Sequence, residues 1–387
     1  MTAGRAAVLP KALILGGGAM GLSTAWGFLR HGWRVELVEQ AAIPNELGSS
    51  VDEARLIRAT YGSEIGYAAM VAEAYEAWDL LWAEIGRPLY HQTGVLARLG
   101  DQEDGWGRTS LATIRALGLP HRIRTGRDLA ASWPHLRFDP DEEWLHQQEG
   151  GVLYARRIVA GLADILRAGG AVLRQHSRAV AVDPDRASIT LADGEVLTGD
   201  RLIVAAGPWT SKLLQDLAGH ATPSLQMSLP ILPPAGLDSA WAATPVMLDI
   251  ENGLYLAPPT PESALKAGDH RFSLAGDPDG ARLAAPEIVA AICEIVLARV
   301  SHPEAYRFGE PRLCFYTVDP QERFRLIPTG DRGWAMTGFS GHGFKFAACL
   351  GLRLSQAIAE EREPAMLTAW GAGLGAIGEQ IGDRIGP

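Results

Sequence analysis

The stretch KALILGGGAMGLSTAWGFLRHGWRVELVE, residues 11–39, decides the fold of this chain. Its apolar run at 11–15 predicts a short buried strand, and residues 21–30 predict a buried helix. Three glycines separate the two and a fourth, Gly21, begins the helix, so the stretch cannot form one long apolar helix of the kind found in a signal peptide. A second strand is predicted at 34–39. The order strand, glycine turn, helix, strand is typical of the first unit of a dinucleotide-binding fold.

The glycine turn fits the pattern G-x-G-x-x-G, and Glu39 follows at the end of the second strand, 18 residues after Gly21. The helix that begins here directs backbone N–H groups and a partial positive charge toward phosphate. Glu39 is expected to accept hydrogen bonds from ribose hydroxyls. The predicted nucleotide-binding residues are Gly16, Gly18, Ala19, Met20, Gly21 and Glu39. The pattern does not separate NAD from FAD, so an NAD-dependent dehydrogenase remains open at this point, as does a glycine turn without a ligand.

Composition excludes several other functions. The 387 residues include 35 basic and 45 acidic side chains, a formal net charge of −10, without a block of Lys and Arg. A nucleic-acid-binding or membrane-surface protein would present a basic face. Three scattered cysteines form neither a disulfide framework nor a zinc motif. We therefore expect no metal, no nucleic-acid partner and no membrane segment, and a reducing, cytoplasmic setting.

The rest of the chain alternates strand-like and helix-like segments, which favours an α/β protein. Apolar residues at helical spacing predict a long helix at 65–85, and residues 201–206 predict another buried strand. The region 223–261 is rich in proline, which removes ladder donors. It is therefore expected to form sheet edge and loop rather than central strand, within a second domain.

Four further segments resemble the monomeric sarcosine oxidase family, in the family's order. They are Ser49–Gly62, Leu202–Trp209, Cys314–Thr317 and Phe339–Phe346. With the glycine turn they extend the resemblance over nearly the whole chain. It implies FAD rather than NAD, and a Rossmann-like FAD-binding domain with a second, mainly antiparallel-sheet substrate domain. The predicted FAD-binding domain comprises 1–90, 150–222 and 315–387, and the predicted substrate domain comprises 91–149 and 223–314.

The resemblance also implies a reaction, in which a secondary amino acid, N-methyl or cyclic, loses a hydride equivalent to FAD. The imine then hydrolyses, and oxygen is reduced to hydrogen peroxide. The cofactor carries the redox chemistry, while the protein supplies position and charge. The implied partners are a small amino acid and oxygen, and a monomer is favoured over an oligomer.

By resemblance, further residues receive roles. Arg58 and Lys345 bind the substrate carboxylate, with Tyr255 in the same pocket. Arg55 lies against the flavin, Lys266 promotes electron transfer to oxygen, and His270 and Tyr316 line the site. Cys314 forms a thioether to the flavin. The remaining cofactor contacts implied are Ser49, Ser50, Gly207, Trp209, Gly341, Gly343, Phe344 and again Arg55 and Lys345.

The residues themselves also support other readings. Arg55 and Arg58 are three apart and would share a face of a helical turn, with Asp52 or Glu53 as surface partners. Lys345 stands between two phenylalanines, which argues against a free surface position. Ala347–Ala359 predicts a helix whose N-terminus points at the cofactor. A lone cysteine is more often a small buried hydrophobe than a reactive group.

Two departures from the family affect the substrate pocket. Ser50 and Val51 replace a histidine-rich stretch, and the region 225–261 matches poorly. The substrate side chain is therefore not predicted. A flavin amine dehydrogenase with another electron acceptor remains an alternative, as does a flavin-binding subunit of a larger oxidase complex.

Overall fold

A six-stranded sheet is built around the glycine-rich stretch in the computed structural model, which describes residues 9–375. The strand order is β20-β21-β13-β1-β2-β9, and all neighbours are parallel except β20 and β21. The central strands are buried on both faces, as expected of a parallel sheet. The strands are β1 (Lys11–Leu15), β2 (Arg34–Val38), β9 (Val172–Arg174), β13 (Arg201–Val204), β20 (Arg325–Thr329) and β21 (Gly333–Thr337).

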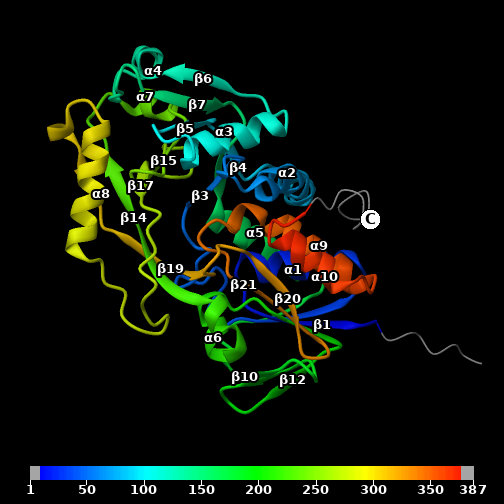
Figure 1. The fold of residues 1–387 in the computed structure, drawn as a ribbon. Coiled ribbons are helices and arrows are strands. Elements are labelled where there is room, and N and C mark those ends of the chain that lie inside the picture. Colours follow the sequence, from blue (N-terminus) through cyan, green and yellow to red (C-terminus); the bar gives the residue numbers. More distant parts are fainter. Residues whose placement is uncertain (1–8, 376–387) are drawn as a thin grey trace, which may run out of the picture.

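Helix α1 (Ala19–Arg30) packs closely against helix α9 (Ala347–Ala359), although more than 300 residues separate them in sequence. Figure 1 shows the blue α1 beside the red α9. Glycine permits this approach: a Cβ at Gly27 would lie 2.0 Å from Ser355 Oγ, and one at Gly351 would lie 2.5 Å from the Ser23 carbonyl carbon. The crossing therefore fixes the two ends of the chain together. The flanking helices are α2 (Ile65–Ile85), α5 (Ala155–Ala168) and α10 (Pro364–Gly371).

A nine-stranded sheet forms the second part of the molecule, shown in cyan to yellow in Figure 1. Its strand order is β18-β14-β17-β16-β15-β5-β7-β6, with β19 also paired to β14, and only β5 and β15 run parallel. The strands are β5 (Val95–Arg98), β6 (Arg122–Thr125), β7 (Glu143–Gln147), β14 (Thr222–Leu232), β15 (Val246–Asp249), β16 (Leu254–Ala257), β17 (Lys266–Gly268), β18 (Arg307–Phe308) and β19 (Arg312–Val318). Helices α3 (Trp106–Ala116), α4 (Gly126–Ser132), α7 (Asp238–Ala242) and α8 (Pro286–Arg299) accompany this sheet.

Strand β14 corrects the expectation for the proline-rich region. It is 11 residues long and pairs with β19 on one side and β17 on the other, so sheet edge and loop is wrong for it. Pro230 pairs with Lys266 of β17, and it is tolerated because its other side lies in a gap of the ladder, after the last pair with β19 at Ser228 and before the first with β18 at Ile231. Proline is excluded only where the missing N–H is needed.

Two smaller three-stranded sheets complete the fold. One contains β10 (Ala179–Asp183), β11 (Ser188–Leu191) and β12 (Val196–Thr198). The other contains β3 (Ala54–Ile57), β8 (Gly151–Tyr154) and β4 (Tyr90–Gln92), in the order β3-β8-β4. Strand β3 carries Arg55, so the expected helical turn for Arg55 and Arg58 is wrong; an extended backbone at 54–57 pairs with β8 instead.

Several other sequence predictions for this architecture hold. The helices at 65–85 and 347–359 and the strand at 11–15 have the predicted bounds. The α/β class with a mainly antiparallel second sheet is confirmed. The proposed domain boundaries remain a proposal, and those at 90/91 and 314/315 fall inside β4 and β19. Within residues 9–375, none of the helices has the length and apolar character needed to cross a membrane.

Candidate functional site

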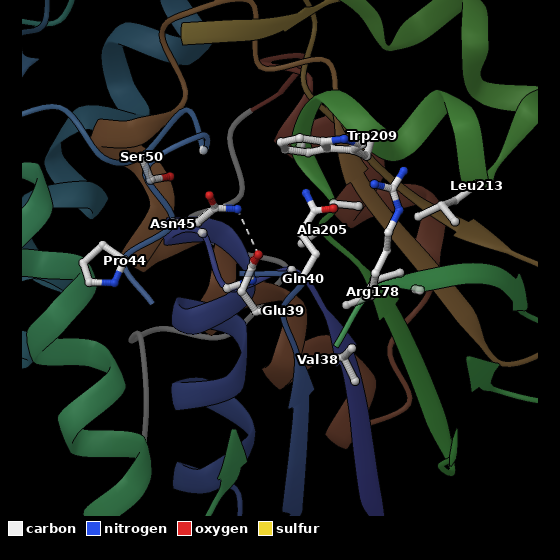
Figure 2. Close-up of a pocket in the computed structure, with 18 of the residues that line it drawn as sticks. Val38, Glu39, Gln40, Pro44, Asn45, Ser50, Arg178, Ala205, Trp209 and Leu213 are labelled. Atoms are coloured by element: carbon white, nitrogen blue, oxygen red, sulfur yellow. Dashed lines mark hydrogen bonds between the residues drawn. The ribbon is translucent and has the colours of Figure 1, made fainter. Parts of the chain in front are cut away.

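A nucleotide cavity of about 260 Å³ opens where the glycine turn meets the end of β2. Figure 2 shows Glu39 and Asn45 joined by a hydrogen bond on one side, while Arg178 and Trp209 face the cavity from the other. Gly207 also lines it. Three segments far apart in sequence therefore form one pocket at the carboxyl ends of parallel strands, where open α/β sheets bind ligands.

The three glycines of the G-x-G-x-x-G turn are required for two structural reasons. A Cβ at Gly16 would lie 2.2 Å from the Ala205 carbonyl oxygen, and one at Gly21 would lie 1.9 Å from the Gly16 carbonyl oxygen. Both positions therefore require close backbone packing. A Cβ at Gly18 would meet only Ser50 Oγ, at 3.3 Å, and would otherwise point into the cavity. The space it leaves fits the close approach of a pyrophosphate.

Helix α1 begins at this cavity with no acidic residue in its first turn and no side-chain cap at Gly18. Its partial positive charge is therefore available to an anionic ligand. Glu39 is buried and accepts hydrogen bonds from the Gly17 amide (2.7 Å), the Asn45 side chain (2.9 Å) and the Ala41 amide (3.0 Å). Burial raises the pKa of Glu39, and these donors oppose the shift. They also hold its carboxylate at the cavity wall, as a ribose ligand requires.

A ring cavity continues from the nucleotide cavity, because Gly18 and Ser50 line both. Its other walls include Ala19, Met20, Ser49, Arg55, Tyr316, Gly341, Gly343 and Phe344. Gly341 has φ +78°, and a Cβ there would lie 2.3 Å from the Tyr316 ring, so only glycine fits under this tyrosine. Helix α9 begins just beyond this loop.

A clamp cavity adjoins the ring cavity. It is formed by neighbouring apolar residues together with Arg58, Tyr255, Lys266, His270, Tyr316 and Lys345. Arg55, Tyr316, Gly341 and Phe344 line both. The nucleotide, ring and clamp cavities therefore form a continuous path from the glycine turn to the basic side chains of Arg58, which is partly buried, and Lys345, which is buried.

Arg58 and Lys345 are basic side chains, Lys345 buried and Arg58 partly buried, and no carboxylate of the described residues lies within ion-pair distance of either. Arg58 donates to the Thr60 carbonyl and lies over the rings of Tyr61 and Trp106, at 4.7 and 5.3 Å. Lys345 donates to Tyr61 Oη (2.7 Å) and the His342 carbonyl (2.9 Å). Burial and Arg58 lower the pKa of Lys345 well below its usual value. Buried cations without an anion are costly, so this arrangement favours an anionic ligand.

Arg55 and Lys266 form a second pair of buried cations, and these do have an anion. Both donate to Asp52 Oδ2, each at 2.5 Å. Arg55 also donates to the Ser49 carbonyl (2.8 Å), and Lys266 to the Ala54 carbonyl (2.8 Å). Although burial alone would raise it, Lys266 and Arg55 hold the pKa of Asp52 far below its usual range. The sequence named Asp52 as a surface partner of the arginines; it partners Arg55, but within the protein.

His270 reaches the clamp cavity from the segment after β17. Burial lowers its pKa to about 4, and Arg58 and Lys345 contribute to the shift. Its Nε2 lies 3.8 Å from Glu322 Oε2. His270 is therefore neutral at physiological pH. Tyr255 and Tyr316 also keep their protons, because burial raises the pKa of both phenols.

Cys314 lies on β19, two residues before Tyr316, so both side chains point to the same face of the strand. Its thiol is 4.0 Å from Arg55 Nη2. Cys314 lines a separate side cavity rather than the ring cavity, together with Asp52, Glu53 and Arg312. Burial raises the pKa of the thiol, and Arg55 opposes this shift.

The structure gathers nearly all of the predicted site residues around the three connected cavities; Gly21 and Cys314 lie just outside them. Sequence reasoning did not single out Tyr61, His342, Trp106 or Arg178 as lining or supporting residues. Tyr61 lies in the segment Ser49–Gly62, whose resemblance to the family was a usable signal, whereas no motif in the sequence includes Arg178. Across the described part of the chain, no group of three or more His, Cys, Asp or Glu side chains is placed to hold a metal ion.

Comparisons with known proteins agree with this geometry. Residues 11–357 match the profile of a family described as "FAD dependent oxidoreductase". The human protein named peroxisomal sarcosine oxidase is 28% identical, covering 88% of this chain and 90% of its own, and monomeric sarcosine oxidase from Bacillus sp. (strain NS-129) is 26% identical, covering 89% and 91%. L-proline dehydrogenase from P. horikoshii shares the fold, with a TM-score of 0.79 at 16% identity, covering 95% of this chain and 97% of that one. The predicted family and its dependence on FAD are confirmed.

Proposed function

Because this chain belongs to the family of FAD-dependent oxidoreductases, we propose that it oxidises the C–N bond of a secondary amino acid, either N-methyl or cyclic. The amine loses two electrons and two protons, which molecular oxygen takes up as hydrogen peroxide, and water hydrolyses the imine. The observation that carries this proposal is the pair of basic side chains without a carboxylate partner, Arg58 and Lys345, at the end of a dinucleotide-shaped path. The sarcosine oxidases among the relatives support the same reaction class.

The residues present fit FAD. The space in front of Gly18 and the N-terminus of α1 would accept the pyrophosphate, and Glu39 the ribose. The loop Phe339–Phe346, with Tyr316 and Arg55, would surround the ring. The cofactor supplies the two-electron chemistry, and the protein's task is to place the substrate against it.

Substrate orientation follows from the clamp. A guanidinium binds a carboxylate through two parallel N–H donors, and a lysine ammonium adds a point charge from another direction. Arg58 and Lys345 together would therefore fix the carboxylate. The amine and its α-carbon would then lie toward Tyr316 and Gly341, which line both the clamp and ring cavities. Leu248, Ile250 and Phe344 provide apolar walls that exclude water.

A peroxide-coupled screen of N-methyl and cyclic amino acids tests the reaction class. Purified holoenzyme should release hydrogen peroxide with at least one of them and bleach its flavin absorbance when oxygen is absent. Esters of the same amino acids are the matched control, because they lack the carboxylate that the clamp binds. Equal turnover of ester and acid would reject the clamp, and the absence of anaerobic bleaching across the panel would reject the reaction class.

We also propose that Cys314 attaches the flavin covalently. The thiol S–H bond and one C–H bond of a flavin methyl group would be replaced by a C–S bond, the two electrons would pass to the flavin ring, and oxygen would reoxidise it. The support is the place of Cys314 on β19, on the same face as Tyr316, and its contact with Arg55, which opposes the rise that burial causes in the thiol pKa. Acid-precipitated wild-type protein should keep its yellow colour in the pellet. Cys314→Ala should release the colour to the supernatant, whereas Cys293→Ala, a change on α8, should leave it in the pellet. Colour in the wild-type supernatant would show that the link is absent.

One observation favours a second candidate, a dehydrogenase that passes electrons to another acceptor. By resemblance Lys266 promotes the reaction with oxygen, yet its ammonium already donates to Asp52 and Ala54. Because the Asp52 carboxylate offsets its positive charge, the ammonium stabilises a forming superoxide less than an unpaired ammonium would. Rapid anaerobic bleaching followed by slow recovery in air would select the dehydrogenase.

The remaining features of the proposal are a monomeric state and a cytoplasmic location. The cysteines Cys293, Cys314 and Cys349 are all free, which fits a reducing compartment. Three relatives of similar length are named monomeric sarcosine oxidase. Light scattering of the purified protein tests the monomer, and fractionation of the source cells tests the location.

A further inference from the structure

A three-residue charge cluster of Asp52, Arg55 and Lys266 lies where the ring, clamp and side cavities meet. Arg55 lines the ring and clamp cavities, Lys266 the clamp cavity and Asp52 the side cavity. The exposed fraction of the side chain is only 10% for Asp52, 13% for Arg55 and 7% for Lys266. Solvent therefore screens these charges poorly.

The geometry leaves the Asp52 carboxylate little freedom. Oδ2 accepts from Lys266 Nζ and Arg55 Nη1, both at 2.5 Å. Oδ1 accepts from the Glu53 amide at 2.8 Å and lies 3.8 Å from Arg312 Nη1. Arg312 itself pairs with Glu53, at 2.8 Å. One carboxylate therefore holds two buried cations and cancels one of their two charges.

We propose that Asp52 is a positioning residue for the flavin reaction, which holds Lys266 and Arg55 beside the ring cavity and sets the net charge there to +1. This inference deepens the proposed function, since it assigns control of the flavin's reduction potential to a residue of the same site. It rests on the proposed function for its biological meaning, but its test needs only bound flavin.

The direction of the effect follows from charge. Two electrons and one proton convert oxidised flavin to its reduced, anionic form, which nearby positive charge stabilises. Asp52 opposes that stabilisation. Replacing its carboxylate by a neutral amide of nearly the same shape leaves both cations uncompensated, and the reduced form should gain stability.

The reduction potential of the bound flavin tests the inference. In an anaerobic dye-equilibrated titration at pH 6.5, Asp52→Asn should favour the reduced form at least tenfold over wild type. For two electrons, tenfold corresponds to about 30 mV. Glu53→Gln is the matched control: it removes the neighbouring carboxylate, whose side chain is 38% exposed and faces Arg312, and should change the equilibrium less than threefold. Equal potentials for Asp52→Asn and wild type would overturn the proposal.

Lys266→Met provides the opposite change and a second route if Asp52→Asn loses its flavin. It removes one cation while Asp52 stays paired with Arg55, so it should disfavour the reduced form. The double variant Asp52→Asn/Lys266→Met has the wild-type net charge and should return toward the wild-type potential. A Lys266→Met potential equal to or above that of wild type would contradict the assigned charges.

A pH series separates this charge effect from a general disturbance. The groups that face Lys266 are Asp52 just before β3, Arg55 on β3 and Cys314 on β19. Tyr316 on β19 and Tyr255 on β16 line the clamp cavity with it. Burial lowers the pKa of Lys266, Asp52 opposes this, and Arg55 adds to the lowering. Without the Asp52 charge, Lys266 should lose its proton at lower pH than in the wild type.

At low pH the flavin reduction potential of Asp52→Asn should therefore exceed that of the wild type. This difference should decline as pH rises through the pKa of Lys266. The same decline should be missing from the double variant, which has no lysine to titrate. A merely structural role for Asp52 predicts an offset that does not depend on pH, and such an offset would reject the inference. Because no amine enters these titrations, failure of the proposed amine oxidation and failure of this inference are distinguishable.

Discussion

Two pairs of basic side chains, each largely shielded from solvent, lie within this site, and they differ in one respect. Arg55 and Lys266 share the Asp52 carboxylate, whereas no carboxylate of residues 9–375 lies within ion-pair distance of Arg58 or Lys345. A buried charge is retained at a cost unless it has a partner. The first pair has its partner within the protein, so it can act on the cofactor at all times. The second pair lacks one, and we infer that the substrate carboxylate supplies it.

The largest effect that the comparison predicts is on ligand binding. Arg58→Met should weaken a carboxylate inhibitor that lacks an amine by tenfold to a hundredfold, because a hydrogen bond to a charged group contributes about 1.5–3 kcal/mol. Flavin spectral perturbation measures the dissociation constant. Arg87→Met is the control, since Arg87 is 54% exposed and pairs with Glu262. An unchanged constant for Arg58→Met would remove the distinction between the two pairs.

The second prediction compares two lysines in the absence of carboxylate ligand. Lys266→Met should lower the free energy of unfolding by about 2 kcal/mol, because it removes a charged hydrogen bond from Asp52. Lys345→Met should instead raise it by about 1 kcal/mol, since a desolvated cation without an anion is removed and binding sites commonly sacrifice stability. Urea unfolding of both variants measures the two changes. Losses of equal size would mean that Lys345 has a partner of equal strength in the free protein.

The difference between the pairs also explains what the sequence could and could not predict. The glycine turn, β1, α1 and Glu39 are local in sequence, so spacing alone located the nucleotide cavity. Arg58 and Lys345 were identified through motifs, but only the fold brings them to one cavity across almost 290 residues. The Asp52–Lys266 contact could not be read from the sequence, because it depends on how β17 and the segment before β3 meet. The prediction of a helical turn at Arg55 was wrong for a related reason, because the extended backbone there depends on the pairing of β3 with β8.

A third prediction concerns pH. Burial and Arg58 lower the pKa of Lys345, and a bound carboxylate favours its protonated form. Affinity for the carboxylate inhibitor is therefore full below the pKa of Lys345 in the free enzyme and falls as pH rises through it, by up to about tenfold per pH unit. Lys345→Met should bind more weakly and lose this pH dependence, whereas Lys266→Met should retain it. A pH-dependent fall that persists in Lys345→Met would assign the proton to another group.

The smallest predicted effect belongs to His270, which lies in the same cavity as the unpaired cations but is neutral. Its pKa is lowered to about 4 by burial, with Arg58 and Lys345 contributing. Between pH 6 and 9 its charge does not change, so His270→Gln should alter the inhibitor constant less than about fivefold and leave the pH dependence intact, since a neutral hydrogen bond contributes about 1 kcal/mol. Below pH 5 His270 should begin to take up a proton and become a third cation in the cavity beside Arg58 and Lys345. The wild type should then bind the carboxylate more tightly, and His270→Gln should not. If the glutamine variant instead loses the dependence between pH 6 and 9, His270 rather than Lys345 is the titrating partner of the substrate carboxylate.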